Sequence, residues 1–138
     1  MSDSIVVDTS AFIAAFSSDD TFHSKASPLY TNLTKGKLDL YTTSYIVVEC
    51  FSLIHRRKGF TYAKDFIESI QPIFNIFWID QSIHWEAWKS MVAKKGVGLN
   101  LVDWTTAIVT TQLGASVFTF DKDFYNEGLS VIPRQIGT

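Results

Sequence analysis

The sequence predicts an α/β fold, a three-layer sandwich in which helices cover both faces of a central, mainly parallel, twisted sheet of about five strands. Short apolar runs alternate with longer helical segments along the 138 residues, and this alternation is typical of a parallel sheet. Hydrophobic residues make up 46% of the chain and aromatic residues 14%, which is enough for a packed core. No repeat, low-complexity tract or linker divides the sequence, so we expect a single domain over residues 1–138.

Strand and helix signals alternate in the first half of the chain. The apolar run ending at Val7 indicates a buried strand, and the polar residues 8–10 can cap a following helix. The pair at 43–44 can cap a later helix, which Gly59 would stop. The expected elements are a strand over 4–7, helices over 9–16 and 23–34, a strand over 38–42 and a helix from 44 to 57.

The second half continues the pattern with less regular boundaries. Thr61 can cap a helix that runs to about residue 74, where Pro72 disturbs its end. The glycines in KGVGLN, residues 95–100, indicate a flexible loop, and Gly114 can close the helix after it. The expected elements are a strand over 76–79, helices over 82–95 and 101–113, a strand over 116–120, a short helical turn, and a strand over 129–132.

Charge and cysteine content narrow the class of protein. The formal charge of −2, with 14 acids against 12 bases, is low for a nucleic-acid binder unless several acids gather at one metal site. Cys50 has no partner for a disulfide or a CxxC site, which fits a reducing, cytoplasmic location. No apolar stretch approaches the ~18 residues of a membrane span, and residues 1–4 lack a signal pattern.

Four acidic residues occupy positions that favour a shared site. Asp8 and Asp121 each follow an apolar strand, and the carboxyl ends of parallel strands are where ligands bind in such sheets. Glu49 lies in SYIVVECFSLI, a helix that is apolar almost all round, and Asp103 lies early in its helix. A carboxylate buried without a partner is strongly unfavourable, so Glu49 needs a cation or a donor.

Each acid also has a purely structural interpretation. Asp8 and Asp121 can be helix N-caps, and Asp103 can close a capping box with Asn100. Glu49 can pair with an arginine of its own helix, at position 56 or 57. A single cluster of acids neutralised by a divalent cation explains all four positions at once, whereas the structural interpretation needs a separate reason for each acid. Oxygen ligands of this kind suit Mg²⁺ or Mn²⁺, and the chemistry indicated is metal-assisted attack of water on a phosphodiester.

Four segments together resemble the PIN-domain ribonucleases, most closely the VapC-type toxins and their solitary relatives, over 5–132. The segments are IVVDTSAFIA, TSYIVVECFSLI, LNLVDWTTAIVTTQLG and VFTFDKDF. The resemblance implies that Asp8, Glu49, Asp103 and Asp121 are an acidic quartet that binds Mg²⁺ or Mn²⁺ and cleaves RNA. It implies supporting roles for Ser10, for Thr119 and for Asp123 as an outer-shell acid. It also implies an antitoxin protein as a partner.

Other residues bear on access and partners. Trp104 directly follows Asp103 and is bulkier than expected there, so we expect it to narrow access to the site. Lys94 and Lys95, in the loop before Asp103, are better candidates for phosphate contacts than the HRRK segment at 55–58, which suits a helix C-terminus. Tryptophans exposed on the surface would indicate a partner surface, and we expect a homodimer.

Two other classes of function stay open. A PIN-like fold kept as a non-catalytic RNA- or protein-binding module has no need of crowded carboxylates. An aspartyl-phosphate enzyme of the phosphatase type needs a second acid two residues after Asp8, where this chain has Ser10. Metal-dependent RNA cleavage is therefore the function that the sequence favours.

Overall fold

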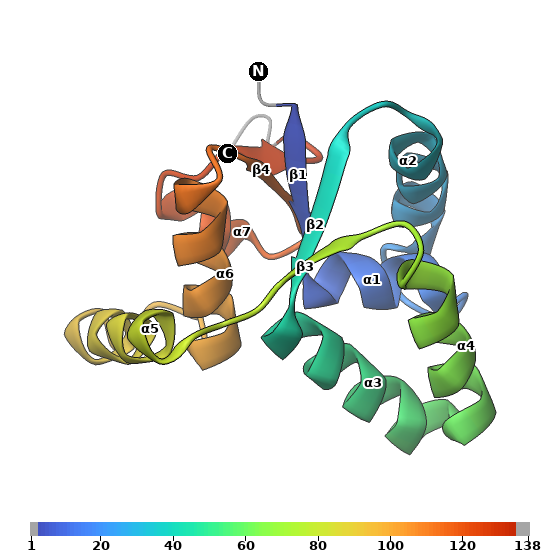
Figure 1. Ribbon diagram of the computed structural model, residues 1–138, viewed down its shortest axis with the longest axis horizontal. Coiled ribbons are helices and arrows are strands. Elements are labelled where there is room, and N and C mark those ends of the chain that lie inside the picture. Colours follow the sequence, from blue (N-terminus) through green and yellow to red (C-terminus); the bar gives the residue numbers. More distant parts are fainter. Residues whose placement is uncertain (1–2, 135–138) are drawn as a thin grey trace.

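The computed structural model describes residues 3–134, which form the predicted three-layer α/β sandwich (Figure 1). The ends of the predicted domain, 1–2 and 135–138, lie outside the described residues. The strands are β1 (Ser4–Val7), β2 (Asp39–Thr43), β3 (Asn75–Phe77), β4 (Ser116–Phe118) and β5 (Val131–Ile132). The helices are α1 (Thr9–Phe16), α2 (His23–Lys35), α3 (Ser44–Lys58), α4 (Phe60–Ile70), α5 (Gln81–Ala93), α6 (Leu101–Gln112) and α7 (Lys122–Asn126).

The sheet is parallel throughout, with the strand order β3-β2-β1-β4-β5. The chain moves outward from β1 to β2 and β3, and then crosses back to place β4 on the other side of β1. The strand order therefore reverses between β1 and β4, the position where open α/β sheets bind ligands. Val7 pairs with Phe118, so the residues that follow the two strands stand side by side.

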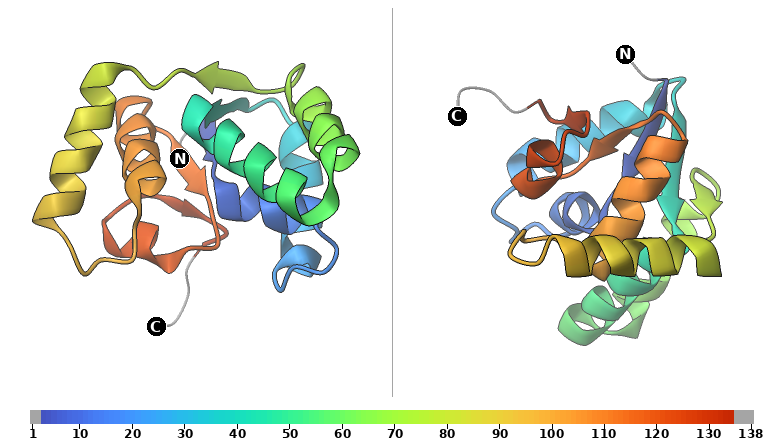
Figure 2. Two further views of the ribbon diagram at one scale, coloured as in Figure 1. Left: turned by 90° about the horizontal axis from the view of Figure 1, so that it is seen from below. Right: turned by 90° about the vertical axis from the view of Figure 1, so that its left-hand side faces the viewer.

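Helices cover both faces of the sheet and enclose two packed clusters. Helices α1 to α4 lie on one side and α5 to α7 on the other (Figure 1), and the left view of Figure 2 shows α5 beside α6, away from α4. Phe12 and Phe66 belong to the larger cluster, under α1 to α4. Trp104, Val117 and Phe124 belong to the smaller one, on the other side. Apolar burial in both layers is the main force holding the sheet in place.

The predicted bounds of α4 differ from the structure at both ends. Thr61 does not cap α4, because Gly59, at φ 95°, turns the chain directly from α3 into a helix beginning at Phe60. Helix α4 ends at Ile70, not near residue 74, because Pro72 has no N–H to continue the helical hydrogen bonds. Among residues 3–134, no helix has the length and apolar character of a membrane span.

Candidate active site

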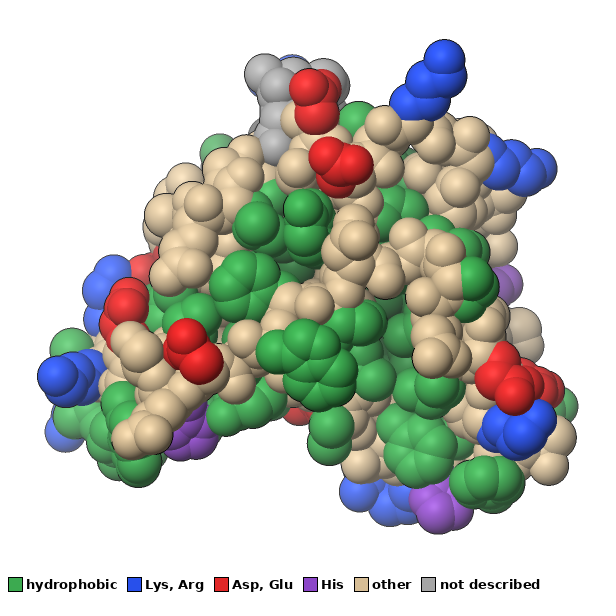
Figure 3. Space-filling model, in the orientation of Figure 1, with side chains coloured by type: hydrophobic (Ala, Val, Ile, Leu, Met, Phe, Trp, Pro, Cys, Tyr) green, Lys and Arg blue, Asp and Glu red, His purple; other side chains and the backbone are tan. Residues whose placement is uncertain are grey.

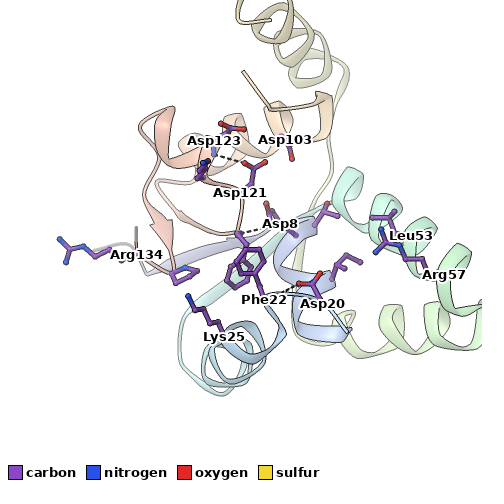
Figure 4. Close-up of a pocket in the computed structure, with 16 residues that line it drawn as sticks. Asp8, Asp20, Phe22, Lys25, Leu53, Arg57, Asp103, Asp121, Asp123 and Arg134 are labelled. Carbon is purple, nitrogen blue, oxygen red and sulfur yellow. Dashed lines mark hydrogen bonds between the residues drawn. The ribbon is translucent and has the colours of Figure 1, made fainter. Parts of the chain in front are cut away.

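A cavity of about 1250 Å³ opens at the point where the strand order reverses (Figure 4). Its lining combines carboxylates, cations and aromatic rings from segments far apart in the sequence. The carboxylates are Asp8, Asp20, Asp103, Asp121 and Asp123, the cations are Lys25, Arg57, Lys122 and Arg134, and the rings are Phe22 and Phe120. Asp8, Asp103, Asp121 and Asp123 lie near one another in the close-up, and Arg57 lies apart from them, on α3.

Asp8 is buried at the carboxyl end of β1, with 3% of its surface exposed. As N-cap of α1, its Oδ1 accepts hydrogen bonds from the Ala11 N–H (3.0 Å) and the Ser10 hydroxyl (2.9 Å). Its Oδ2 accepts a bond of 2.6 Å from the Thr119 hydroxyl. Burial raises the pKa of Asp8 to about 6, although these hydrogen bonds oppose the shift. The carboxylate is therefore fixed in orientation but costly to ionise.

Two hydroxyls join the ends of β1 and β4 around this carboxylate. Thr119 Oγ1 donates to Asp8 and accepts a bond of 3.0 Å from the Asp121 N–H. Ser10 Oγ donates to Asp8 and accepts a bond of 3.0 Å from the Phe120 N–H. The backbone donors of residues 120 and 121, after β4, thus go to side chains of the site, whereas the Asp8 N–H after β1 donates to the Phe118 carbonyl. Strand β4 accordingly ends at Phe118, short of the predicted residue 120.

Asp121 and Asp123 form a second pair of acids in the cavity. Asp121 caps α7, where its Oδ1 accepts a bond of 3.0 Å from the Asp123 N–H. Burial raises the pKa of Asp121, and the neighbouring Asp123 carboxylate adds to the shift. A Cβ at Gly98 would collide with the Asp123 carboxylate as it is placed, so the loop before α6 lies directly against this acid.

Asp103 enters the cavity from the first turn of α6. Its Oδ2 accepts a bond of 2.9 Å from the Asn100 N–H and its own N–H donates to Asn100 Oδ1, so the capping box is present. Burial raises the pKa of Asp103 to about 7, against the effect of the Asn100 N–H. The charges of Asp8, Asp121 and Glu49 raise it further. The capping interpretation and the shared site are thus compatible, since one residue serves both.

Glu49 occupies a different position from the other three acids. It is half-buried on α3 and does not line the cavity, although Leu53 and Arg57, further along the same helix, do. None of the ion pairs formed within residues 3–134 includes Glu49, so it is not paired with Arg56 or Arg57. Its charge nevertheless acts on Asp103, as the pKa of Asp103 shows. Its role as a fourth metal ligand stays a prediction.

The donor set suits a hard divalent cation held partly by water. Within the described chain, no ion pair neutralises any acid of the cavity, although several of them repel one another. In that same part of the chain no three acidic, histidine or cysteine groups form a ready-made metal cage. Mg²⁺ commonly binds through one or two carboxylates, retained waters and substrate phosphates, so an open site of this kind fits it.

The surroundings of the site differ from what the sequence predicts, and the expected role of Trp104 is wrong. Trp104 does not narrow access, because it is buried in the smaller cluster and does not line the cavity. Lys94 and Lys95 do not line the cavity either, and their contact with RNA phosphates stays a prediction. Lys94 binds Glu127 at 2.6 Å and lies over the Trp104 ring, so it is engaged away from the site.

The sequence does not predict that several of the residues lining the cavity belong to the site. Phe22, Lys25 and Arg134 lie far from the acidic motifs, in segments that show only a loop, a helix surface and a chain end. Arg57 belongs to the HRRK segment, which helix-end chemistry alone can explain. Charge in the sequence thus indicates cations but not which of them face the acids.

Thr119→Val is expected to destabilise the protein by about 1–3 kcal/mol, since valine matches threonine in shape but leaves the Asp121 N–H unpaired. The same change should raise the pKa of Asp8 further, because a donor to Asp8 is lost. Urea unfolding measures the first effect and NMR titration the second. Thr119→Ser, which keeps the hydroxyl, is the control and should recover most of both. Wild-type stability in the valine variant would contradict the network described above.

The fold and the acidic cavity define an α/β protein whose site lies at the switch point of a parallel sheet. The sequence matches the PIN domain family model over residues 5–127, and the chain belongs to this family. No curated protein matches the sequence.

Solved structures extend this likeness over nearly the whole chain. VapC20 of Mycobacterium tuberculosis, described as a Sarcin-Ricin loop cleaving toxin, is 23% identical, with a TM-score of 0.81 and coverage of 91% of this chain and 95% of that one. VapBC2 of Rickettsia felis, bound to a DNA fragment from its promoter, is 11% identical, with a TM-score of 0.69 and coverage of 93% and 96%. DNA-bound VapBC of Salmonella typhimurium is 15% identical, with a TM-score of 0.68 and coverage of 95% and 97%. At these identities the likeness is one of fold.

Proposed function

We propose that this protein is a metal-dependent endoribonuclease that hydrolyses RNA phosphodiester bonds. The observation that carries the proposal is that Asp8, Asp103 and Asp121 face one cavity, each with a raised pKa and no cation paired to it. These three residues would hold Mg²⁺ or Mn²⁺, with Glu49 as a further ligand and Asp123 as an outer-shell acid. The bound ion would neutralise the acids and activate a water for attack on phosphorus.

The residues around the acids have separate roles in this mechanism. The hydroxyls of Ser10 and Thr119 hold the Asp8 carboxylate in one orientation, so no reorganisation is needed when a ligand arrives. Arg57, on the α3 wall of the cavity, is placed to contact an RNA phosphate away from the acids. The helix caps at Asp8, Asp103 and Asp121 fix their backbones, which places the site on rigid elements.

Two findings favour RNA as the substrate: the family and its structural relatives, and the size and charge of the cavity. The chain belongs to the PIN domain family, and the structurally similar VapC20 is a Sarcin-Ricin loop cleaving toxin. The cavity is wide enough for an unpaired nucleotide and carries both acids and cations along its wall.

The test is cleavage of a fluorescently labelled single-stranded RNA by the purified chain. We expect products with Mn²⁺ or Mg²⁺ and none with EDTA, and restoration when metal is added in excess over the chelator. Intact RNA at millimolar Mn²⁺ would contradict the proposal. If the protein then still bound RNA, the non-catalytic binding module would be the better interpretation.

We further propose two protein partners, both in the cytoplasm. The VapBC structures are of paired proteins, which supports an antitoxin that binds this chain and suppresses its activity. A second copy of the chain is the other partner. Three tryptophans lie exposed next to the edge strand β3 and along α5, namely Trp78 (75%), Trp85 (52%) and Trp88 (48%). Figure 3 shows hydrophobic side chains exposed across the face of the molecule that β3 crosses.

Light scattering after size exclusion tests the homodimer. We expect a mass of twice the 15.6 kDa of one chain, and a shift toward the monomer when Trp78 and Trp85 are both replaced by serine. Replacing the exposed Tyr62, on α4, by serine is the control and should leave the mass unchanged. A monomeric wild-type protein at micromolar concentration would contradict the pairing.

A further inference from the structure

An aromatic stack forms one wall of the cavity beside the acids. The rings of Phe22 and Phe120 are nearly parallel, at 12°, with their centroids 4.8 Å apart. Both rings line the cavity, and 41% of Phe22 is exposed. In Figure 4, Phe22 lies between the carboxylates of Asp8 and Asp121 on one side and Lys25 on the other. An exposed phenylalanine in a polar cavity offers a flat apolar surface to a ligand.

Hydrogen bonds fix the backbone that carries Phe22. The Phe22 N–H donates to Asp20 Oδ1 at 2.9 Å, and the His23 N–H donates to the Asp20 carbonyl at 3.1 Å. The His23 ring bonds through Nδ1 to the Ala14 carbonyl, at 2.8 Å, which ties the start of α2 to α1. The ring is therefore presented by a structured turn, and ordering it on ligand binding costs little conformational entropy.

The other ring of the stack is joined directly to the acidic residues. Phe120 precedes Asp121 in the chain, and its N–H donates to Ser10, which in turn donates to Asp8. A base that lies on Phe22 thus has its sugar and phosphate next to the carboxylates. Lys25 and Arg134 also line the cavity and bring positive charge to one side of Phe22, and Asp20 lies on its other side (Figure 4).

We propose that Phe22, supported by Phe120, is a base-stacking subsite for an unpaired nucleotide beside the scissile phosphate of single-stranded RNA, with Lys25 contacting its backbone. This inference rests on the function proposed above. Stacking on an aromatic ring accepts any base, so the subsite selects unpaired over paired RNA and leaves the base sequence to other contacts. Base pairing would keep the nucleotide in its helix and out of the cavity.

The first experiment compares three substitutions at position 22 by steady-state cleavage of a short single-stranded RNA with Mn²⁺. Phe22→Ala should raise KM about 5- to 150-fold, the range for one base–aromatic stack. Phe22→Leu should raise KM nearly as much, because leucine is apolar but has no flat ring. Phe22→Trp should keep a KM close to that of wild type. Phe60→Ala is the matched control, since Phe60 is exposed on α4 outside the cavity.

The second experiment identifies the nucleotide that stacks. An abasic residue is moved through the RNA one position at a time, and KM is measured for wild type and for Phe22→Ala. At one position the abasic residue should raise the KM of wild type and leave the KM of Phe22→Ala almost unchanged, because the two changes remove the same contact. Lys25→Ala should also change the salt dependence of RNA binding. The slope of the logarithm of the association constant against the logarithm of the salt concentration should become less steep by about 0.7, the value for one lost phosphate contact on single-stranded RNA.

Each outcome decides the subsite separately from the proposed function. If wild type cleaves RNA and Phe22→Ala has the KM of Phe60→Ala, the subsite is wrong and the nuclease stands. If Phe22→Leu restores wild-type KM, Phe22 only packs against Phe120 and the subsite is again wrong. If wild type binds RNA without cutting it, the nuclease fails and fluorescence anisotropy with the same variants decides the subsite. If it neither cuts nor binds RNA, both are overturned.

Discussion

Asp103→Asn should lower metal-dependent RNA cleavage by more than about 100-fold, the upper end of the loss expected when only an outer-shell partner of a metal is changed. The asparagine oxygen can still accept the Asn100 N–H, so the capping box and the fold are kept while the negative charge is removed. The loss should fall on kcat and not only on KM, because Asp103 would hold the ion that activates the attacking water. Cleavage of a labelled RNA at saturating Mn²⁺ measures it.

Asp80→Asn is the matched control for this experiment. Asp80 is, like Asp103, an aspartate that accepts a backbone hydrogen bond at the start of a helix: its Oδ1 accepts a bond of 2.9 Å from the Ile83 N–H of α5. Unlike Asp103, it does not line the cavity. Cleavage by the Asp80 variant should equal that of wild type. A loss of cleavage in Asp103→Asn alone, when both variants are purified alike, also excludes a contaminating ribonuclease. Near-wild-type cleavage by Asp103→Asn would remove Asp103 from the mechanism.

The metal-free protein should lose stability as the pH rises from about 4 to 8. The folded state holds protons on Asp8, with a pKa of about 6, and on Asp103, with a pKa of about 7, whereas the unfolded chain releases them near 3.8. The stabilising contribution is therefore fully present below pH ~4 and is lost as the pH passes through the two folded-state pKa values. Mn²⁺ should reverse the loss at pH 8, because it replaces the protons.

Thermal unfolding at several pH values, with and without Mn²⁺, measures this linkage. At pH 8, Mn²⁺ at 100 times its Kd should raise Tm by roughly 10 °C, from about 2.7 kcal/mol of binding linkage. At pH 5 the rise should be much smaller, because protons compete for the carboxylates. Asp103→Asn should flatten the pH dependence of the metal-free protein. An equal effect of Mn²⁺ at both pH values would show that it binds elsewhere.

The strand-end acids were predictable because two simple rules meet at them. An apolar run followed by aspartate places Asp8 and Asp121 at strand ends, and parallel pairing of neighbouring strands then brings them to one edge. The helix boundaries followed from caps and glycines in most cases. At α4 the rule failed, because Gly59, at φ 95°, turns the chain so that the helix begins at Phe60, before Thr61 could cap it.

The cations and rings of the cavity were not predictable, because they depend on tertiary contacts. Phe22 and Lys25 reach the acids only because α2 packs on α1 and turns its N-terminus toward β4. Lys94 is close to Asp103 in the sequence and was therefore a candidate for phosphate contacts. In the structure it forms an ion pair with Glu127, which is distant in sequence. Charge patterns along the chain carry no information about such partners.

The proposed mechanism requires that Asp8, Asp103 and Asp121 form one divalent-cation site. Calorimetric titration of Mn²⁺ into the wild-type protein at pH 8, and into Asp103→Asn and Asp121→Asn, tests it most directly. We expect saturable binding by wild type and at least ~10-fold weaker binding by each variant. No binding by wild type at millimolar Mn²⁺, or equal affinity in all three proteins, would contradict it.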